Sequence, residues 1–182
     1  MIKTGLDKLF ALIALLVLSP IFIFISFIIW IFEQKPAFFL QNRVGKNKNE
    51  FTIYKFRTMA DGKITTLGNI LRKTGIDELP QILNILKGDM AFVGPRPLTM
   101  QDIVRLEWNT SYYNERWSIS PGIVGLAQLA PACNKKMSWF YDQLYLQKKS
   151  FGLDVKIILA ATLIPFVGKS YVKKWIHGKR KV

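Results

Sequence analysis

The uncharged run from Leu9 to Phe32 is the feature that most constrains what this chain can fold into. It exceeds the about 20 apolar residues that a membrane-spanning helix needs. A cleaved signal peptide fits poorly, because the run is long and no small-residue cleavage site follows it. Near its middle, Pro20 removes the N–H that would bond to Leu16, and the hydroxyl of Ser19 can bond back to a carbonyl instead. We therefore expect a membrane helix that is interrupted at Ser19-Pro20.

Two arrangements of this segment fit the sequence. One is a kinked helix that spans the membrane, and the other is a helix-break-helix hairpin that dips into one leaflet and returns. Residues 9–18 and 21–32 would each extend roughly 15–18 Å as a helix, about half of a hydrocarbon core of roughly 30 Å, so length leaves both open. Positive residues on both flanks prefer the cytoplasmic side, which weakly favours the hairpin. These flanking residues are Lys3, Lys8, Lys35, Arg43, Lys46 and Lys48.

The composition is both basic and apolar. Lys and Arg number 26 against 12 for Asp and Glu, the formal net charge is +14, and 50% of the residues are hydrophobic. Such a chain suits an anionic membrane surface, phosphorylated ligands, or both. No zinc spacing or nucleic-acid-binding signature is present, so we expect no nucleic-acid partner. The single cysteine, Cys133, excludes an intramolecular disulfide, and with His177 as the one histidine we expect no His-dependent chemistry.

The C-terminal part also points to a membrane. Leu153 to Val172 is apolar and contains Pro165, and basic residues without any acid follow it. With Trp175 among them, these residues are typical of an interfacial segment that faces anionic headgroups. A solvated basic tail is the alternative.

Between these ends the patterns predict short elements without a repeat or an interdomain linker. The fold class we expect is mainly α with a small β element (α+β). The residues 36–50 are polar and basic, with a turn at Gly45. The expected elements are a strand at 51–56, a short helix around 67–71, a helix at 77–87 that ends at Gly88, a rigid loop at 94–97, a helix at 98–108 that continues towards 116, a turn at 120–122 and a helix at 137–149.

The adjacent carboxylates Asp77 and Glu78 are the main candidates for chemistry. They stand at the predicted start of a helix, where backbone N–H groups and the helix dipole favour negative charge. A carboxylate there can be a plain N-cap, or it can attack phosphorus and form an acyl phosphate. Attack on a phosphate requires a divalent metal and several cations to offset charge repulsion. The cations near these segments are Lys55, Arg57, Arg72 and Arg96.

Each of these cations also has a structural explanation. Lys55 alternates with apolar strand residues and fits a solvent-facing position. Arg72 can pair with Asp77, and Arg96 can hold a turn between its two prolines. No Gly-rich P-loop is present, so nucleotide hydrolysis of that class is not expected. The residues by themselves therefore indicate a membrane-surface protein with a site for phosphates.

Several motifs between Tyr54 and Gln128 give the chain a resemblance to a known family. In order and spacing, the chain resembles the bacterial sugar transferases, that is, the monotopic phosphoglycosyl transferases, in a minimal form with little beyond the catalytic domain. The resemblance extends from the N-terminal apolar segment to about residue 160. The matching segments are Tyr54–Met59, Leu71-Arg72, Asp77–Gln81, Asn84–Met90, Val93–Pro97 and Pro121–Gln128.

The resemblance implies a reaction. Such enzymes move a sugar 1-phosphate from a UDP-sugar to undecaprenyl phosphate, release UMP and start a membrane-bound glycan. Asp77 would be the nucleophile of a covalent phosphosugar intermediate, and Glu78 would assist at a Mg²⁺ ion or at the polyprenyl phosphate. Arg72 and Arg96 would face phosphates. The loop Pro95-Arg96-Pro97 would contribute to the nucleotide site, and Lys55 and Arg57 would complete the binding of the substrate phosphates.

The resemblance also implies an architecture. Residues 1–35 would form a re-entrant membrane helix broken at Ser19-Pro20, and residues 36–182 a cytosolic catalytic domain with a basic interfacial segment at its C-terminus. The enzyme would rest on the cytoplasmic face of the bacterial inner membrane, in contact with anionic lipids. The sequence leaves open whether the protein forms a homodimer.

The chain departs from the family pattern at a few positions. After Ala127-Gln128 the family commonly continues with Asn-Gly-Arg-Asn, whereas this chain has residues 129–134 without an arginine. Trp117 stands where the family often has His, and Ser120 stands at a position that is often basic. The altered stretch is the best support for a second hypothesis, a catalytically silent scaffold that binds a partner enzyme or polyprenyl phosphate. A third hypothesis, a basic membrane-associated protein that binds nucleic acid, has only the net charge in its favour.

Overall fold

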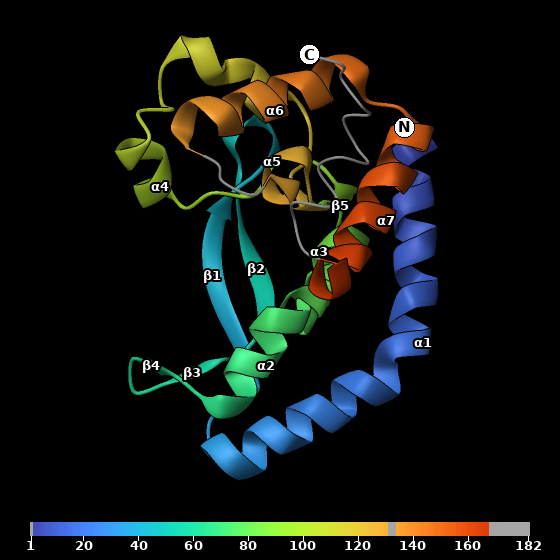
Figure 1. The fold of residues 1–182 in the computed structure, drawn as a ribbon, viewed down its shortest axis with the longest axis vertical. Coiled ribbons are helices and arrows are strands. Elements are labelled where there is room, and N and C mark those ends of the chain that lie inside the picture. The colour runs from blue at the N-terminus through green and yellow to red at the C-terminus, as the bar shows by residue number, and fades with distance from the viewer. Residues whose placement is uncertain (1, 131–133, 168–182) are drawn as a thin grey trace. The chain divides into compact units, whose positions relative to one another are not determined.

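The chain folds into short helices and small sheets, and the computed structural model describes residues 2–130 and 134–167 (Figure 1). Its contacts divide the chain into two compact units, which are described separately below. The first unit comprises Met1–Asn42 and Phe51–Met90, and the second Arg43–Glu50 and Ala91–Val182. In the described residues helices predominate and each sheet has two strands. The predicted mainly helical fold with a small β element is therefore confirmed.

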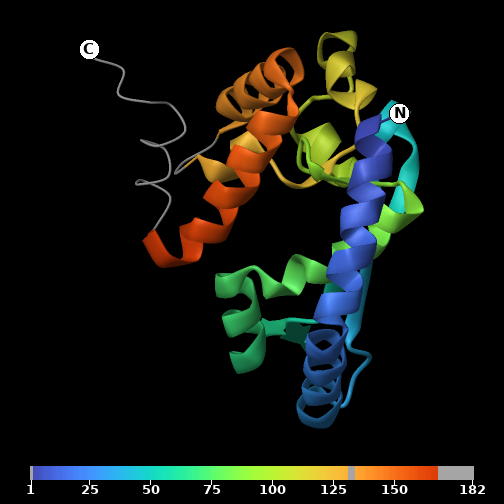
Figure 2. The same cartoon turned by 90° about the vertical axis from the view of Figure 1, so that its right-hand side faces the viewer.

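Helix α1, Ile2–Glu33, contains the apolar run and is bent rather than straight (Figures 1 and 2). Pro20 lies inside it and cannot donate to the carbonyl of Leu16, and the hydroxyl of Ser19 donates to that carbonyl at 2.8 Å instead. Within the described residues, Lys3–Glu33 is the one helix long and apolar enough to cross a membrane. Only 17% of its most apolar window is buried within the described structure, so most of the apolar surface of α1 is exposed.

Strand β2, Glu50–Phe56, confirms the strand predicted at 51–56, and it pairs with β1, Phe38–Val44. Strand β1 lies in the polar and basic stretch 36–50, where a turn at Gly45 but no strand was predicted. Its exposed, partly polar sequence hides the strand, because a strand with little burial shows no hydrophobic alternation. A short hairpin follows, formed by β3, Met59–Ala60, and β4, Lys63–Ile64.

Helix α2, Thr66–Thr74, agrees with the predicted short helix. The hydroxyl of Thr65 accepts the N–H of Gly68 at 3.0 Å and so caps the helix start. Gly75 ends the helix in the left-handed conformation, with φ of 74°.

The segment predicted as one helix at 77–87 consists of two pieces. A 3₁₀-helix, η2, covers Ile76–Gln81, and α-helix α3 covers Ile82–Lys87. Pro80 explains the difference, because it has no N–H with which to continue an α-helical hydrogen-bond ladder. The 3₁₀ pattern is seen at Glu78, whose N–H donates to the carbonyl of Gly75, three residues earlier, at 3.2 Å. Gly88 stops α3 with φ of 94°, as predicted.

The fully buried Asn84 joins α3 to the edge of β2. Its amide oxygen accepts the N–H of Tyr54 at 3.1 Å, and its amide nitrogen donates to the carbonyl of Thr52 at 2.7 Å. The side chain therefore replaces one residue of a neighbouring strand and gives partners to two partly buried backbone groups of β2.

We expect Asn84→Ala to lower the free energy of unfolding by about 3 kcal/mol, because it leaves the partly buried N–H of Tyr54 and C=O of Thr52 unpaired. Thermal unfolding in detergent micelles, followed by circular dichroism, measures the change. Asn69→Ala, on the exposed side of α2, is the matched control and should leave stability nearly unchanged. Equal stability of the two variants would contradict the role given to Asn84.

The second unit contains a parallel pair of short strands, β5, Ala91–Val93, and β6, Gly122–Val124. The turn predicted at 120–122 is wrong at Gly122, which already belongs to β6. Strands of only three residues are too short to show a periodicity, so the sequence alone could not reveal them. The predicted helix at 98–108 is shorter: α4 covers Met100–Arg105, and 3₁₀-helix η3 covers Ser111–Ser118.

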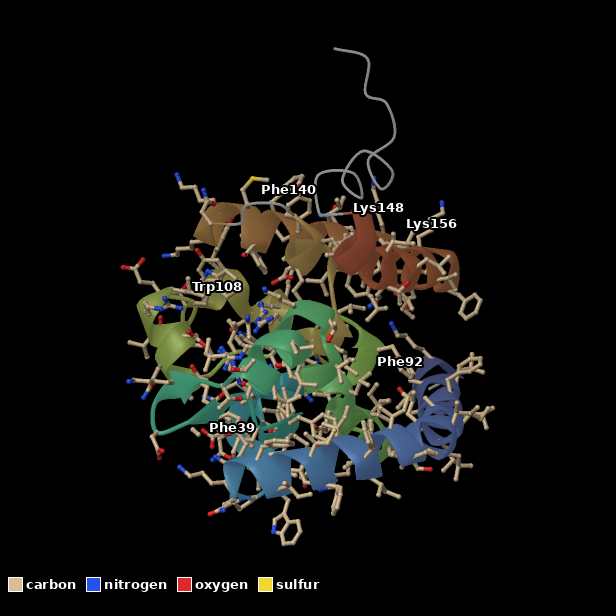
Figure 3. All side chains as sticks on the ribbon, turned by 60° about the horizontal axis from the view of Figure 1, so that its bottom comes forward. Phe39, Phe92, Trp108, Phe140, Lys148 and Lys156 are labelled. Atoms are coloured by element: carbon tan, nitrogen blue, oxygen red, sulfur yellow. The ribbon has the colours of Figure 1, made fainter. Side chains whose placement is uncertain are left out.

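The described part of this unit also contains the 3₁₀-helix η1, Lys46–Lys48, and the α-helices α5, Leu126–Leu129, α6, Lys135–Lys148, and α7, Phe151–Val167. Helix α6 agrees with the helix predicted at 137–149. The apolar residues Ile157 and Ala160 of α7 pack in a buried cluster with Val93, Leu126 and residues of α6. Figure 3 shows Phe140, Lys148 and Lys156 pointing outward from α6 and α7. The basic tail that was predicted as an interfacial segment lies outside the described residues.

Candidate functional site

Asp77 and Glu78 lie in the first turn of η2, and the chain brings Lys55 of β2 to them. The ammonium group of Lys55 lies 2.6 Å from a carboxylate oxygen of Glu78. The Lys55 side chain is only 15% exposed and that of Glu78 is 24% exposed, so the alternative of a solvent-facing lysine is wrong. This ion pair fixes Glu78, and within the described residues no ion pair to Asp77 is formed.

Burial of Asp77 raises the pKa of its carboxyl above the ordinary value of 3.8, and the nearby Glu78 carboxylate raises it further. The positive charges of Lys55 and Arg72 lower the pKa, although by less than the combined opposing effects. A carboxylate in such surroundings is less well solvated than one in water, and its charge is less stable. The site thus destabilises the ionised form of Asp77.

We expect Asp77→Asn to stabilise the folded protein at neutral pH. A carboxyl whose pKa is raised on folding binds its proton more tightly in the folded state, so its contribution to stability falls as pH rises through the raised pKa. The asparagine variant lacks this penalty. The difference in melting temperature from the wild type should be largest at neutral pH and should vanish below the ordinary pKa. Melting curves in detergent at a series of pH values check this, and a difference that grows towards acid pH would contradict it.

Arg72 approaches the carboxylates from α2. Its Nε donates to the hydroxyl of the buried Thr58 at 2.8 Å, and its charge acts on Asp77 without an ion pair between them. The predicted alternative of an Arg72–Asp77 pair is therefore wrong for the described structure. The hydrogen bond to Thr58 directs the guanidinium group and keeps it beside the carboxylates.

Gly68 allows α2 to lie directly on Thr58. A Cβ atom at Gly68 would stand 2.1 Å from the carbonyl oxygen of Thr58, far inside van der Waals contact. The backbones of Gly68 and Thr58 are therefore in direct contact, and this contact sets the distance from α2 to the segment after β2. Sequence reasoning gave neither residue a role, although Thr58 lies in the matching segment Tyr54–Met59, because a helical glycine and a buried threonine have no signal that separates them from ordinary core positions.

Arg57 follows β2 and bonds to the backbone around the end of α1. Its Nε donates to the carbonyl of Pro36 at 2.7 Å, and its backbone N–H donates to Ala37 at 2.7 Å. These bonds connect the start of the β1 segment to the end of β2. A role of Arg57 towards phosphates stays a prediction.

The loop Pro95-Arg96-Pro97 belongs to the second unit, after β5. Both prolines are buried and the Arg96 side chain is exposed. Gly94 and Gly122 make this possible, because a Cβ atom at Gly122 would lie 2.1 Å from the nitrogen of Gly94. The loop is therefore pressed against β6 and presents Arg96 as its exposed residue.

Two guanidinium groups hold the backbone of this loop. Nη2 of Arg116 donates to the carbonyl of Arg96 at 2.6 Å, and Nη1 of Arg43 donates to the carbonyl of Pro97 at 3.1 Å. Arg116 is 4% exposed, and its Nε donates to Asp142 at 2.8 Å. Sequence reasoning did not identify Arg116, Arg43 or Asp142 as part of a site, because their partners are distant in sequence.

The structure thus brings together Lys55, Arg72, Asp77 and Glu78 in the first unit and holds Pro95-Arg96-Pro97 in the second. Over the described stretches 2–130 and 134–167, no three His, Cys, Asp or Glu residues cluster in a way that could hold a metal ion. Two adjacent carboxylates, a lysine and an arginine make a site that suits an anionic ligand next to a carboxylate of raised pKa. In the altered stretch 129–134, residues 131–133 lie outside the described residues.

Comparison with known proteins shows the family of this chain. A family model described as bacterial sugar transferase matches residues 1–168. The chain therefore belongs to the bacterial sugar transferase family.

Its curated relatives include three that cover most of this chain. The UDP-N-acetylgalactosamine-undecaprenyl-phosphate N-acetylgalactosaminephosphotransferase of Aeromonas hydrophila is 37% identical, over 86% of this chain and 42% of that protein. The UDP-glucose:undecaprenyl-phosphate glucose-1-phosphate transferase of Xanthomonas campestris pv. campestris is 35% identical, over 84% of this chain and 36% of that protein. The exopolysaccharide production protein PSS of Rhizobium leguminosarum bv. phaseoli is 38% identical, over 89% and 94%. The chain thus spans less than half the length of the first two and nearly all of the third.

Proposed function

We propose that this protein is a phosphoglycosyl transferase that moves a sugar 1-phosphate from a UDP-sugar to undecaprenyl phosphate and releases UMP. The observation that carries the proposal is the Asp77 carboxylate of raised pKa beside the Lys55–Glu78 ion pair and Arg72. The names of the Aeromonas and Xanthomonas relatives, which state a UDP-sugar donor and an undecaprenyl-phosphate acceptor, support the substrates. Assembly of a membrane-bound glycan would begin with this reaction.

The proposed chemistry proceeds in two displacements at the same phosphorus. A carboxylate oxygen of Asp77 attacks the phosphorus that carries the sugar, the bond from this phosphorus to the bridging oxygen breaks, and UMP leaves with that oxygen. A phosphate oxygen of undecaprenyl phosphate then attacks the phosphorus of the aspartyl phosphosugar, and the Asp77 carboxylate is released. A covalent intermediate divides one difficult transfer into two easier ones. The raised pKa supports this role, because a poorly solvated carboxylate is the more reactive nucleophile.

Glu78 and Asp77 fit a divalent cation. Their oxygens are the hard donors that Mg²⁺ prefers, and Mg²⁺ is commonly held by one or two carboxylates together with waters and substrate phosphates. The repulsion that raises the pKa of Asp77 is of the kind that a dication relieves. When bound, Mg²⁺ would supply charge that stabilises the phosphates during displacement. In the structure, the ion pair with Lys55 holds Glu78 in position beside Asp77.

The arginines supply the remaining positive charge. Arg72, directed by Thr58, would contact the phosphate at the reacting centre, and Arg57 would add charge at the end of β2. Arg96, exposed on its clamped loop, would bind the diphosphate of the nucleotide. A guanidinium group suits this task because its donors match phosphate oxygens in pairs.

The exposed apolar and basic surfaces support a membrane arrangement as part of the proposal. We place α1 in one leaflet as a re-entrant hairpin that turns at Ser19-Pro20, so residues 36–182 stay on the cytoplasmic face of the bacterial inner membrane, where the anionic acceptor and the aqueous donor meet. The exposed apolar residues of α7 follow one another at every fourth position, which supports contact with lipid, and Lys148 and Lys156 suit anionic headgroups. These apolar residues are Phe151, Val155, Leu159 and Leu163.

Release of UMP from a panel of UDP-sugars tests the proposal. The full chain is assayed in nanodiscs with Mg²⁺, with and without undecaprenyl phosphate. Sustained release with at least one sugar, dependent on the lipid, is the expected result. Donor binding without any UMP release, from protein shown to be folded, would contradict the proposal and favour a silent scaffold.

A further inference from the structure

The buried Arg116 makes a contact that stability alone does not explain. Its guanidinium lies 5.0 Å from the ring of Trp108, which Figure 3 labels, and 4.9 Å from that of Trp117, and it pairs with Asp142, which is also 4% exposed. Removing two charges from water costs about as much as their attraction returns, so a buried ion pair is a weak source of stability. We therefore consider whether Arg116 fixes the position of the groups that it contacts.

The Nη2 donor of Arg116, which does not bond to Asp142, binds the backbone of the Pro95-Arg96-Pro97 loop. While Nε is held by Asp142 at 2.8 Å, Nη2 reaches the carbonyl of Arg96 at 2.6 Å. The planar guanidinium fixes the angle between its donors, so the position of Asp142 on α6 is transmitted to the loop backbone. A lysine in the same place would keep the charge but has no rigid fork with which to hold both partners.

Arg43 holds the same loop one residue further on. Its Nη1 donates to the carbonyl of Pro97 at 3.1 Å and lies 3.7 Å from a carboxylate oxygen of Asp102. Two successive carbonyls, those of Arg96 and Pro97, are thus each bound to a guanidinium group whose side chain is largely buried. Pro95 and Pro97 fix their own φ angles, so little freedom is left to the backbone between them.

We infer that Arg116 and Arg43 are positioning residues, which hold the loop backbone so that the exposed Arg96 meets the diphosphate of the nucleotide donor. This inference rests on the proposed function for the identity of the ligand. Neither residue touches the ligand in this account, because both guanidinium groups are committed to the loop from its buried side. Preorganisation of Arg96 lowers the entropy cost of binding, and its loss should weaken nucleotide binding rather than only reduce the amount of folded protein.

Binding of UDP, measured by titration calorimetry on the full chain in nanodiscs with Mg²⁺, tests the inference. Arg116→Lys should weaken UDP binding about tenfold, the effect expected when one charge-assisted hydrogen bond is lost or misplaced. In a double-mutant cycle with Arg96→Ala, the loss from Arg116→Lys should disappear, because the residue acts only through Arg96. Lys135→Arg is the matched control, because Lys135 belongs to an exposed ion pair with Glu107. The Lys135→Arg variant should bind UDP as tightly as the wild type does.

Arg43→Lys is a second, milder perturbation of the same loop, through the carbonyl of Pro97. If Arg116→Lys does not fold, the double-mutant cycle of Arg43→Lys with Arg96→Ala tests the inference instead. Unchanged UDP affinity in folded variants, or losses that simply add to that of Arg96→Ala, would overturn the inference. No UDP binding by the wild type would overturn it as well. Because UDP binding needs no turnover, a wild type that binds UDP but releases no UMP from UDP-sugars would contradict the proposed function alone.

Discussion

Asp77→Asn is expected to reduce sugar-phosphate transfer by about 10⁴-fold or more, because the amide cannot form the acyl phosphate through which the reaction is proposed to pass. The change keeps the size and shape of the side chain and removes a poorly solvated charge, so the fold should be retained. UMP release with both substrates, in nanodiscs with Mg²⁺, measures the loss.

Asp61→Asn is the control for this substitution. Asp61 is an exposed aspartate that pairs with Lys35 in the same unit, and its loss should leave turnover unchanged. Near-normal turnover in a folded Asp77→Asn protein would exclude Asp77 as the nucleophile. A similar drop in both variants would indicate a general sensitivity to lost negative charge.

Gly68→Ala should have the second largest effect, on stability and on turnover together. The added Cβ would stand 2.1 Å from the carbonyl oxygen of Thr58, so α2 must move away from the segment after β2. We expect a loss of about 1–3 kcal/mol in the free energy of unfolding, as for other overpacked sites. The movement also carries Arg72 away from the hydroxyl of Thr58, which should lower turnover per folded molecule.

Gly152→Ala is the matched control, because nothing lies within 4 Å of a Cβ at this helical glycine. Alanine there should be neutral or slightly stabilising. Thermal unfolding and UMP release are measured for both variants. Wild-type stability of Gly68→Ala would contradict the close contact between α2 and Thr58, and normal turnover despite lower stability would separate Arg72 from the chemistry.

Local signals in the sequence were sufficient for some elements and not for others. Aromatic and β-branched residues predicted β2, the short helix expected after Thr65 or Thr66 is α2, and Gly88 ends α3 as expected. The parallel pair β5–β6 depends on contacts between residues about 30 positions apart, which no local pattern records. The 3₁₀-helix at Ile76–Gln81 could have been anticipated from Pro80, which interrupts the α-helical ladder within its first turn.

The candidate site shows the same division. The adjacent acids Asp77 and Glu78 and the basic residues around them are visible in the sequence, because charged residues in apolar surroundings stand out. Which base meets which acid is decided by tertiary packing: Lys55 pairs with Glu78, whereas Arg72 bonds to Thr58 rather than to Asp77. The division of the chain at residues 35 and 36, the bound Mg²⁺ and a homodimer stay predictions.

Intact-mass spectrometry can detect the proposed covalent intermediate on Asp77. The full chain is incubated with the UDP-sugar that supports UMP release and with Mg²⁺, but without undecaprenyl phosphate, and is quenched in acid. We expect an added mass equal to one sugar phosphate, which fragmentation locates on Asp77. This added mass should be absent from Asp77→Asn and should be lost when undecaprenyl phosphate is added before the quench. Transfer that proceeds with both substrates while no adduct forms on Asp77 at any time before the quench would contradict the proposed covalent intermediate.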